Sequence, residues 1–117
     1  MGKRAPTTIS SAALHVLLAI GPLARHGYAI MSEVERITDG AVRMGAGTLY
    51  GTLKRLLTDG LIEECPAPAT NDRDDERRRY YRLTVRGETA ASAEVARMEA
   101  LLRRYSGKTG AVHPSTR

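Results

Sequence analysis

The chain has 117 residues, enough for one domain and too few for two independent cores of ordinary size. Its single cysteine, Cys65, excludes an internal disulfide and a metal site made of several thiolates. Lys and Arg number 18 against 13 Asp and Glu, and this net charge of +5 favours an anionic partner, of which nucleic acid is the commonest. Since most of the cations are arginines, the base composition of the coding sequence is the alternative source of the charge.

An apolar stretch near the start of the chain predicts a buried helix. Residues 12–20 follow Lys3 and Arg4, which is the order of a signal peptide, but His15 interrupts the stretch and no small-x-small cleavage site follows it. The stretch is also far shorter than the ~20 residues that span a bilayer. We therefore expect a helix from residue 8 or 10 to residue 20 in a cytoplasmic protein without a membrane partner, preceded by a flexible arm over residues 1–7.

Two further helices are expected next. Ile30, Val34 and Ile37 recur at helical spacing and predict a helix over residues 27–37. A third helix over residues 46–59, ended by Gly60, has an apolar stripe formed by Leu49, Leu53, Leu56 and Leu57. The opposite half of this helix carries small, hydroxyl and cationic residues, namely Gly47, Thr48, Gly51, Lys54, Arg55 and Thr58.

The hydrophobic period then changes from that of a helix to that of a strand. Residues 61–65 and 79–83 read as two strands joined by a long charged loop. Thr84 is placed to cap a last helix over residues 85–105, and the polar tail over residues 106–117 is expected to be disordered. The fold class is therefore mainly α with a small β-hairpin: a winged helix-turn-helix over residues 8–84 followed by a C-terminal helix.

Several short motifs in this order resemble the PadR family of transcriptional regulators. The motifs are His26-Gly27-Tyr28, Gly47-Thr48-Leu49-Tyr50, Leu53-Lys54-Arg55-Leu56, Asp59-Gly60-Leu61-Ile62-Glu63 and Arg79-Tyr80-Tyr81-Arg82-Leu83-Thr84, and the resemblance covers residues 10–105. It implies a dimeric winged-helix repressor that binds a palindromic operator, dimerises through its C-terminal helix, and is often released by a small effector such as a phenolic compound.

The chain departs from the family pattern in two places. Gly45-Ala46 stand where the family usually carries Ser-Pro, so the start of the third helix is less firmly fixed, because Gly caps less well than Ser and Ala lacks the fixed φ of Pro. The C-terminal region is also limited to one helix, so we expect no large effector pocket.

The third helix is the candidate recognition helix. No acid lies between Arg43 and Thr58, and the three cations there can bind phosphate or guanine. Gly51 would permit close approach to a DNA backbone. The candidate DNA-binding residues of this region are Arg43, Thr48, Tyr50, Gly51, Lys54, Arg55 and Thr58. The alternatives are a solvated face on a structural helix and, for Tyr50 and Tyr28, a packing role.

The hairpin has an acidic tip and a basic base. Asp72, Asp74, Asp75 and Glu76 should be repelled by DNA, whereas Arg77, Arg78 and Arg79 can reach the minor groove or flanking phosphates. The base of this wing therefore completes the predicted DNA-binding set. The alternative is a salt-bridged hairpin without a partner.

The last helix carries a short heptad seam. Its members are spaced by 4, 3, 4 and 3 residues, which suits pairing with a second copy. The candidate dimerisation residues are Ala91, Val95, Met98, Leu102 and Tyr105. The alternative is that the same stripe packs within one chain, against the first helix.

Catalytic and metal sites are not indicated. His15, His26 and His113 lie on different elements without metal-ligand spacing, and no nucleophile–base set can be assembled with Cys65. We expect a non-enzymatic regulator without cofactor or metal, a sequence-specific repressor that binds a palindromic operator in double-stranded DNA as a homodimer, with a small-molecule effector left open. The alternative function is a winged-helix protein-interaction module, which bulk DNA would not retain at low salt.

Overall fold

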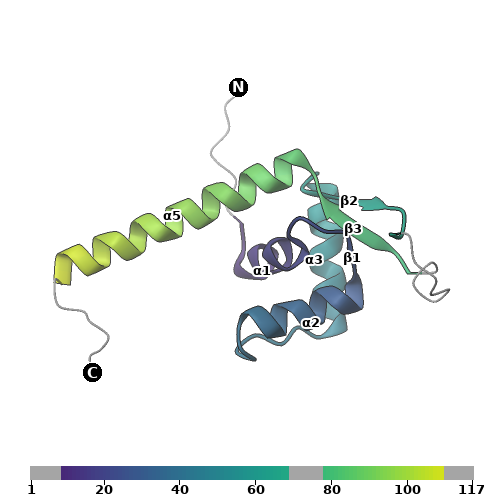
Figure 1. Cartoon of the computed structure of the whole chain (residues 1–117), viewed down its shortest axis with the longest axis horizontal. Coiled ribbons are helices and arrows are strands. Elements are labelled where there is room, and N and C mark those ends of the chain that lie inside the picture. Colours follow the sequence, from purple (N-terminus) through teal and green to yellow (C-terminus); the bar gives the residue numbers. More distant parts are fainter. Residues whose placement is uncertain (1–8, 69–77, 110–117) are drawn as a thin grey trace.

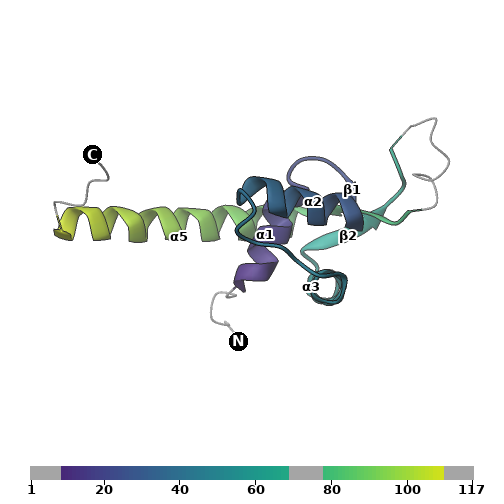
Figure 2. The same ribbon diagram turned by 90° about the horizontal axis from the view of Figure 1, so that it is seen from below.

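The computed structural model describes residues 9–68 and 78–109. The elements are α1 (Ser11–Ile20), β1 (Arg25–His26), α2 (Gly27–Ile37), α3 (Ala46–Thr58), β2 (Ile62–Cys65), β3 (Tyr80–Leu83) and α5 (Val85–Thr109). Three helices and a small sheet form one cluster, and α5 leaves it as a long projecting helix (Figures 1 and 2). The predicted fold class and order of elements are confirmed, with one strand added. The expected arm over residues 1–7 and the acidic wing tip lie outside the described residues.

Helix α1 is the centre of the core. Ser10 is its N-cap, with Oγ accepting from the Ala13 N–H at 3.1 Å, and the chain turns out of the helix at Gly21 with φ of +59°. Val16, Leu17 and Ile20 are fully buried, and α1 contacts α2, α3, α5 and β3. A helix that is apolar nearly all round needs cover on every side, and this central position supplies it.

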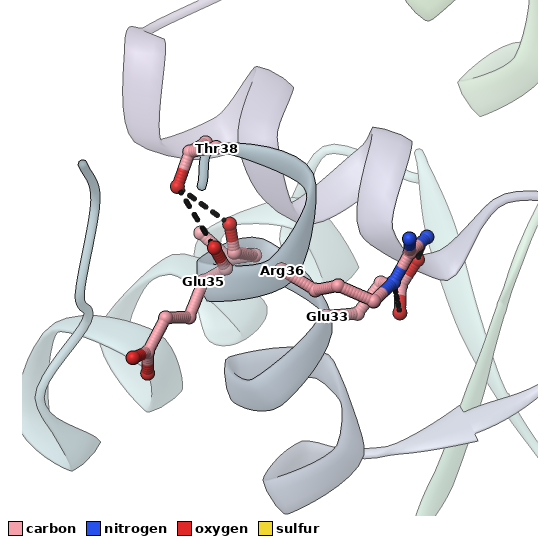
Figure 3. Close-up of polar contacts among 5 residues, drawn as sticks. Glu33, Glu35, Arg36 and Thr38 are labelled. Carbon is pink, nitrogen blue, oxygen red and sulfur yellow. Dashed lines mark hydrogen bonds and ion pairs between the residues drawn. The ribbon is translucent and has the colours of Figure 1, made fainter. Parts of the chain in front are cut away.

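Helix α2 is amphipathic and ends in a tight turn. Ile30 and Val34 are fully buried, but Ile37, the third member of the predicted stripe, is exposed because the helix ends there. The Thr38 hydroxyl donates to the Val34 carbonyl at 2.8 Å and accepts from the Val42 N–H at 3.0 Å. Figure 3 shows Thr38 closing the end of the helix while Arg36 lies over Glu33. This turn sets the direction in which the chain continues to α3.

The three-stranded antiparallel sheet has the order β1-β3-β2. In the β2–β3 pair Ile62 lies opposite Leu83 and Cys65 opposite Tyr80. Strand β1 was not predicted, because a segment of two residues is too short to show an alternating pattern. It pairs with β3 immediately before α2 begins, and so fixes the start of α2 against the base of the wing.

Helix α5 is fixed to the cluster at its N-terminal end. The Thr84 hydroxyl donates to the Gly60 carbonyl at 2.7 Å and accepts from the Gly87 N–H at 3.0 Å, which confirms Thr84 as its cap. A Cβ at Gly87 would lie 1.9 Å from the Leu61 carbonyl oxygen, so only glycine fits at this contact. The later part of the helix extends away from the other elements (Figure 1).

The predicted end of this helix at residue 105 was wrong, because α5 continues to Thr109. Gly107 is the only poor helix former in the added turn, and its cost of about 1 kcal/mol does not stop a helix that is already propagating. Residues 106–109 therefore do not belong to a disordered tail, and residues 110–117 lie outside the described part of the chain.

Candidate nucleic-acid interface

Helix α3 presents the predicted outward face. Its leucines at positions 49, 53 and 56 are buried against the core, so the other half of the helix faces away from the domain. This half is exposed and carries Gly47, Thr48, Gly51, Lys54, Arg55 and Thr58. Burial of one side of α3 therefore aligns hydroxyl and cationic groups on the other.

The cations near α3 differ in their surroundings. Lys54 and Arg55 are exposed and form no ion pair within residues 9–68 and 78–109. Arg43, in the loop before α3, lies with its Nε 3.3 Å from Glu35 Oε2 on α2. Both partners of that pair are largely exposed, so it contributes little to stability and can be replaced by a phosphate contact.

The start of α3 lacks a side-chain cap. Gly45 occupies the N-cap position with extended backbone and makes no side-chain hydrogen bond there. The first-turn N–H groups of the helix consequently have no side-chain acceptor at this cap, and the positive end of the helix dipole is exposed beside Gly47 and Thr48. This end of α3 is suited to face an anion.

The base of the wing is less positive than its sequence indicates. Arg79 Nη1 lies 3.4 Å from Glu64 Oε2, and Arg82 Nε donates to Glu63 Oε2 at 2.7 Å. These ion pairs form because the antiparallel register brings the two acids of β2 against β3. Arg78 and Arg79 are exposed, and Arg77 lies outside the described residues.

A groove of about 330 Å³ joins the start of α2, the outer side of α3 and the base of the wing. Its lining is His26, Gly27, Tyr28, Tyr50, Arg78, Arg79 and Tyr81. A Cβ at Gly27 would lie 2.4 Å from the Tyr50 hydroxyl oxygen, so glycine at this position allows Tyr50 to rest on the first turn of α2. The Tyr28 and Tyr50 residues are 65% and 51% exposed, so their hydroxyl-bearing rings stand at the open surface.

Two other residues that line the groove, Tyr81 and His26, are fixed by their surroundings within the domain. The buried Tyr81 has its pKa raised, first by burial and then by the nearby Glu64 carboxylate, and therefore keeps its phenolic proton at neutral pH. His26 caps α2, with its Nδ1 accepting from the Ala29 N–H at 3.1 Å. Sequence reasoning did not assign His26, Tyr28 or Tyr81 to the site, because only the pairing of β1 with β3 brings them beside Tyr50.

The predicted dimerisation residues fall into two groups. Ala91 is only 7% exposed and packs in the core of its own chain, so its assignment to a dimer seam was wrong. The buried side of the first turns of α5 packs against α1. Val95 is half-buried, and Met98, Leu102 and Tyr105 are exposed on the projecting part of the helix, together with Leu101. Met98 is 44% exposed and Leu102 is 66% exposed.

The described residues do not form other kinds of site. Within residues 9–68 and 78–109 no three His, Cys, Asp or Glu side chains gather closely enough to hold a metal ion. No helix in this part of the chain combines the length and apolar character needed to cross a membrane. Burial raises the pKa of the Cys65 thiol, which makes it a weak nucleophile at neutral pH.

The comparisons with known proteins agree with this geometry. The PadR-like family of transcriptional regulators matches the chain over residues 15–93. A transcriptional regulator from Clostridium thermocellum is 25% identical, with a TM-score of 0.65 over 86% of this chain and 97% of that one. A PadR-like transcription factor from Bacteroides fragilis is 22% identical, with a TM-score of 0.63 over 81% of this chain and 86% of that one. The RosR protein of H. salinarum is 23% identical, with a TM-score of 0.60 over 92% of this chain and all of that one.

No curated protein matches the sequence. The family match nevertheless covers more than half of the chain and includes α2, α3, the wing and the start of α5. The members of this family, like the similar solved structures, are regulators of transcription and not enzymes. The chain therefore belongs to the PadR-like family of transcriptional regulators.

Proposed function

We propose that this regulator is a sequence-specific repressor that binds a palindromic operator in double-stranded DNA as a homodimer. The observation that carries the proposal is the outward face of α3, where Lys54 and Arg55 stand exposed without an acidic partner in the described part of the chain. A helix with this face fits the major groove, which is wide enough to admit it. Its proposed place of action is the cytoplasm.

The proposed contacts divide into two kinds. Arg43, Lys54, Arg55 and the wing-base arginines bind phosphates, which position the domain on the duplex. Thr48 and Thr58 lie on the exposed face of α3, where a hydroxyl can donate to a phosphate and a methyl group can contact thymine. Tyr50 reaches the backbone from the side of α3. Because few of these side chains read bases directly, specificity depends on combining two half-sites.

The projecting part of α5 is the proposed means of combining them. A short α3 reads only a few base pairs, and two recognition helices roughly 34 Å apart read half-sites separated by one turn of DNA. Val95, Met98, Leu102 and Tyr105 form an apolar stripe on α5, and the last three of them are exposed in the described part of the chain. Pairing with the same stripe of a second copy would bury it.

The proposal is tested by measuring DNA binding against salt concentration. Wild-type protein is titrated into labelled DNA fragments selected from a random pool, by fluorescence anisotropy between ~50 and ~200 mM salt. We expect a steep loss of affinity with salt and a weaker, flatter response for the double variant Lys54→Ala, Arg55→Ala. Arg97→Ala is the matched control, because Arg97 is an exposed arginine of α5 that is paired with Glu94 and does not belong to the proposed DNA-contacting residues. Absence of binding at low salt would support the protein-interaction module instead.

An effector remains a prediction of the family resemblance. The place to look for it is a groove of about 360 Å³ beside the junction of α1 and α5, lined by Leu17, Leu18, Gly21, Pro22, Leu83, Glu88, Ala91 and Ser92. An effector that binds there would contact both the core and the base of the proposed dimerisation helix. A rise in the unfolding temperature with a panel of small aromatic acids, together with release from DNA, would identify it.

A further inference from the structure

The apolar stripe on the projecting part of α5 points in the same direction as the buried side of the first turns of that helix. We call its four large side chains the distal stripe; they are 44–66% exposed, namely Met98, Leu101, Leu102 and Tyr105. At about 100° per residue, all four lie on the side of the helix that carries Gly87 and Ala91. Gly87 and Ala91 are buried where α5 packs on its own domain. The distal stripe therefore continues, along the helix, the side that the domain covers.

This shared direction decides how a second copy can pair. In a parallel pair, two helices about 8–10 Å apart would turn this side toward each other along their whole length. Around Ala91 that side is already occupied by α1 of the same chain, so two copies of α1 would have to fit into a gap narrower than one helix. Figures 1 and 2 show the later part of α5 running on beyond α1 and the rest of the cluster. An antiparallel pair brings only these later parts together.

The spacing of the stripe suits an antiparallel register centred at residue 100. In that register Val95 lies level with Tyr105 of the partner copy, and Met98 lies level with Leu102 of the partner copy. Each apolar residue of the seam is thus matched by another at the same distance from the centre. The two-fold symmetry of a homodimer requires this kind of self-complementary surface.

The same register places the two domains at a useful distance. Thr109, the last residue of α5, comes level with Ala91 of the partner copy, so the end of each helix arrives where the partner's domain begins. The joints at Gly87 of the two copies lie about 39 Å apart along the helix axis. This distance is close to the roughly 34 Å that separates half-sites one turn of DNA apart, whereas a parallel pair would hold both joints at one end.

The area available for burial also favours the antiparallel pair. The exposed part of each side chain of the distal stripe is on the order of 100 Å², so two stripes alone would bury roughly 800 Å². A specific, stable interface buries about 1,200 Å² or more, and the domain must supply the difference. Helix α1 carries an exposed leucine, Leu18, which is 44% exposed beside the groove at the junction of α1 and α5. Only in the antiparallel pair does the end of the partner's α5 reach α1.

We propose that two copies of this chain pair antiparallel along their distal stripes, centred near residue 100, with the end of each α5 seated against α1 of the partner copy at Leu18. The proposal rests on the homodimer of the proposed function and specifies its orientation, its register and a second contact surface. Helix α1, which is the centre of the core, is then also part of the interface.

Single cysteines on the seam distinguish the two orientations. Cys65→Ser removes the one native thiol, and Met98→Cys and Leu102→Cys are made separately in that background. In the antiparallel register the two copies of position 98 are displaced by about 6 Å along the axis in addition to the separation of the helices, which is too far for a disulfide. We therefore expect neither variant to cross-link alone under mild oxidation, and an equal mixture of the two to give a cross-linked dimer on non-reducing electrophoresis. Ala96→Cys, at an exposed position off the stripe, is the control and should not cross-link.

The contact with α1 is tested by sedimentation. Leu18→Lys should raise the dimer dissociation constant by roughly tenfold or more, although residue 18 lies outside α5, because it places an unpaired cation in the interface. Ile37→Lys replaces another exposed apolar residue, at the end of α2, and should leave the constant unchanged. Circular dichroism checks that each variant is folded.

The outcomes separate this proposal from the proposed function. A wild-type protein that sediments as a monomer refutes the homodimer, and the antiparallel pair with it. A wild-type dimer whose Met98→Cys and Leu102→Cys variants each cross-link alone is parallel, which overturns the orientation and leaves the homodimer standing. The orientation is equally overturned if the dimer persists and neither the single variants nor their mixture cross-link. A Leu18→Lys variant that pairs as tightly as wild type refutes the seat on α1.

Discussion

Gly51 lies in the middle of α3 on its exposed face, and a Cβ added there would meet no atom within 4 Å. Its φ is not positive, so the fold does not require glycine at this position. Glycine in a helix interior costs roughly 1 kcal/mol relative to alanine, chiefly because it loses more backbone entropy on folding. The variant Gly51→Ala should therefore raise the free energy of unfolding by about 1 kcal/mol, which corresponds to roughly 4–8 °C in Tm for a domain of this size.

The same variant should weaken DNA binding. A methyl group on the outward face would stand between α3 and the duplex if the helix approaches the DNA as closely as the proposed function requires. Thermal unfolding followed by circular dichroism measures the first effect, and fluorescence anisotropy with the selected DNA measures the second. A variant that is more stable and binds less well would show that the cost of this glycine in stability is offset by contact with a partner.

Gly27→Ala is the matched control for the steric argument. There a Cβ would lie 2.4 Å from the Tyr50 hydroxyl oxygen, so the substitution must displace the Tyr50 ring and should lower Tm, although the chemical change is the same. If Gly51→Ala is destabilising, the helix must be restrained at that point by a contact that the structure lacks. If it binds DNA as tightly as wild type, close approach at Gly51 is refuted.

Three further predictions concern other parts of the chain. Met98→Lys should convert the proposed dimer to a monomer, as measured by sedimentation, because burial of an unpaired cation costs several kcal/mol. Ala96→Lys, at an exposed position of α5 off the stripe, should leave the dimer intact. An unchanged mass for Met98→Lys would place the interface elsewhere. Deletion of residues 72–76 should leave DNA binding intact or improve it by removing negative charge, and alanine at residues 77–79 should weaken it; loss of binding in a folded deletion variant would contradict this reasoning. Cys65 should react with iodoacetamide more slowly than a free thiol at pH 8, because burial raises its pKa and reduces the thiolate fraction, and denaturation in urea should remove the difference; equal rates in the folded protein would contradict this.

The outward face of α3 could be predicted from the sequence because one physical constraint determines it. Leucines at positions 49, 53 and 56 must be buried, and helical geometry then assigns every other side chain of the helix to a direction. The winged-helix fold followed in the same way from the change of hydrophobic period after Gly60. The pattern of apolar residues was enough to predict the structure wherever a single helix or strand buries one of its sides.

Features that depend on two distant elements could not be read in this way. The groove requires β1, whose two residues carry no detectable pattern, to place His26 and Tyr28 beside Tyr50. The pairing of Arg79 and Arg82 with acids of β2 depends on strand register, which the long loop leaves undetermined in the sequence. Ala91 fits the heptad spacing but is buried in the core of its own domain, because the apolar stripe of α5 packs on the domain at its N-terminal end and is exposed to solvent at its other end.

The close contact of Gly87 with the Leu61 carbonyl has a mechanical consequence for the proposed dimer. The joint between the domain and α5 is tightly packed at Gly87, where there is no room for a side chain, and this packing restricts bending there. A helix of 25 residues is about 37 Å long, and a rotation of about 5° at its far end displaces the domain by about 3 Å. The projecting helix therefore acts as a lever, because a small change in how two copies pair produces a larger change in the distance between their recognition helices. One residue inserted between Ala91 and Met98 would rotate the part of α5 before the insertion by about 100° relative to the part after it.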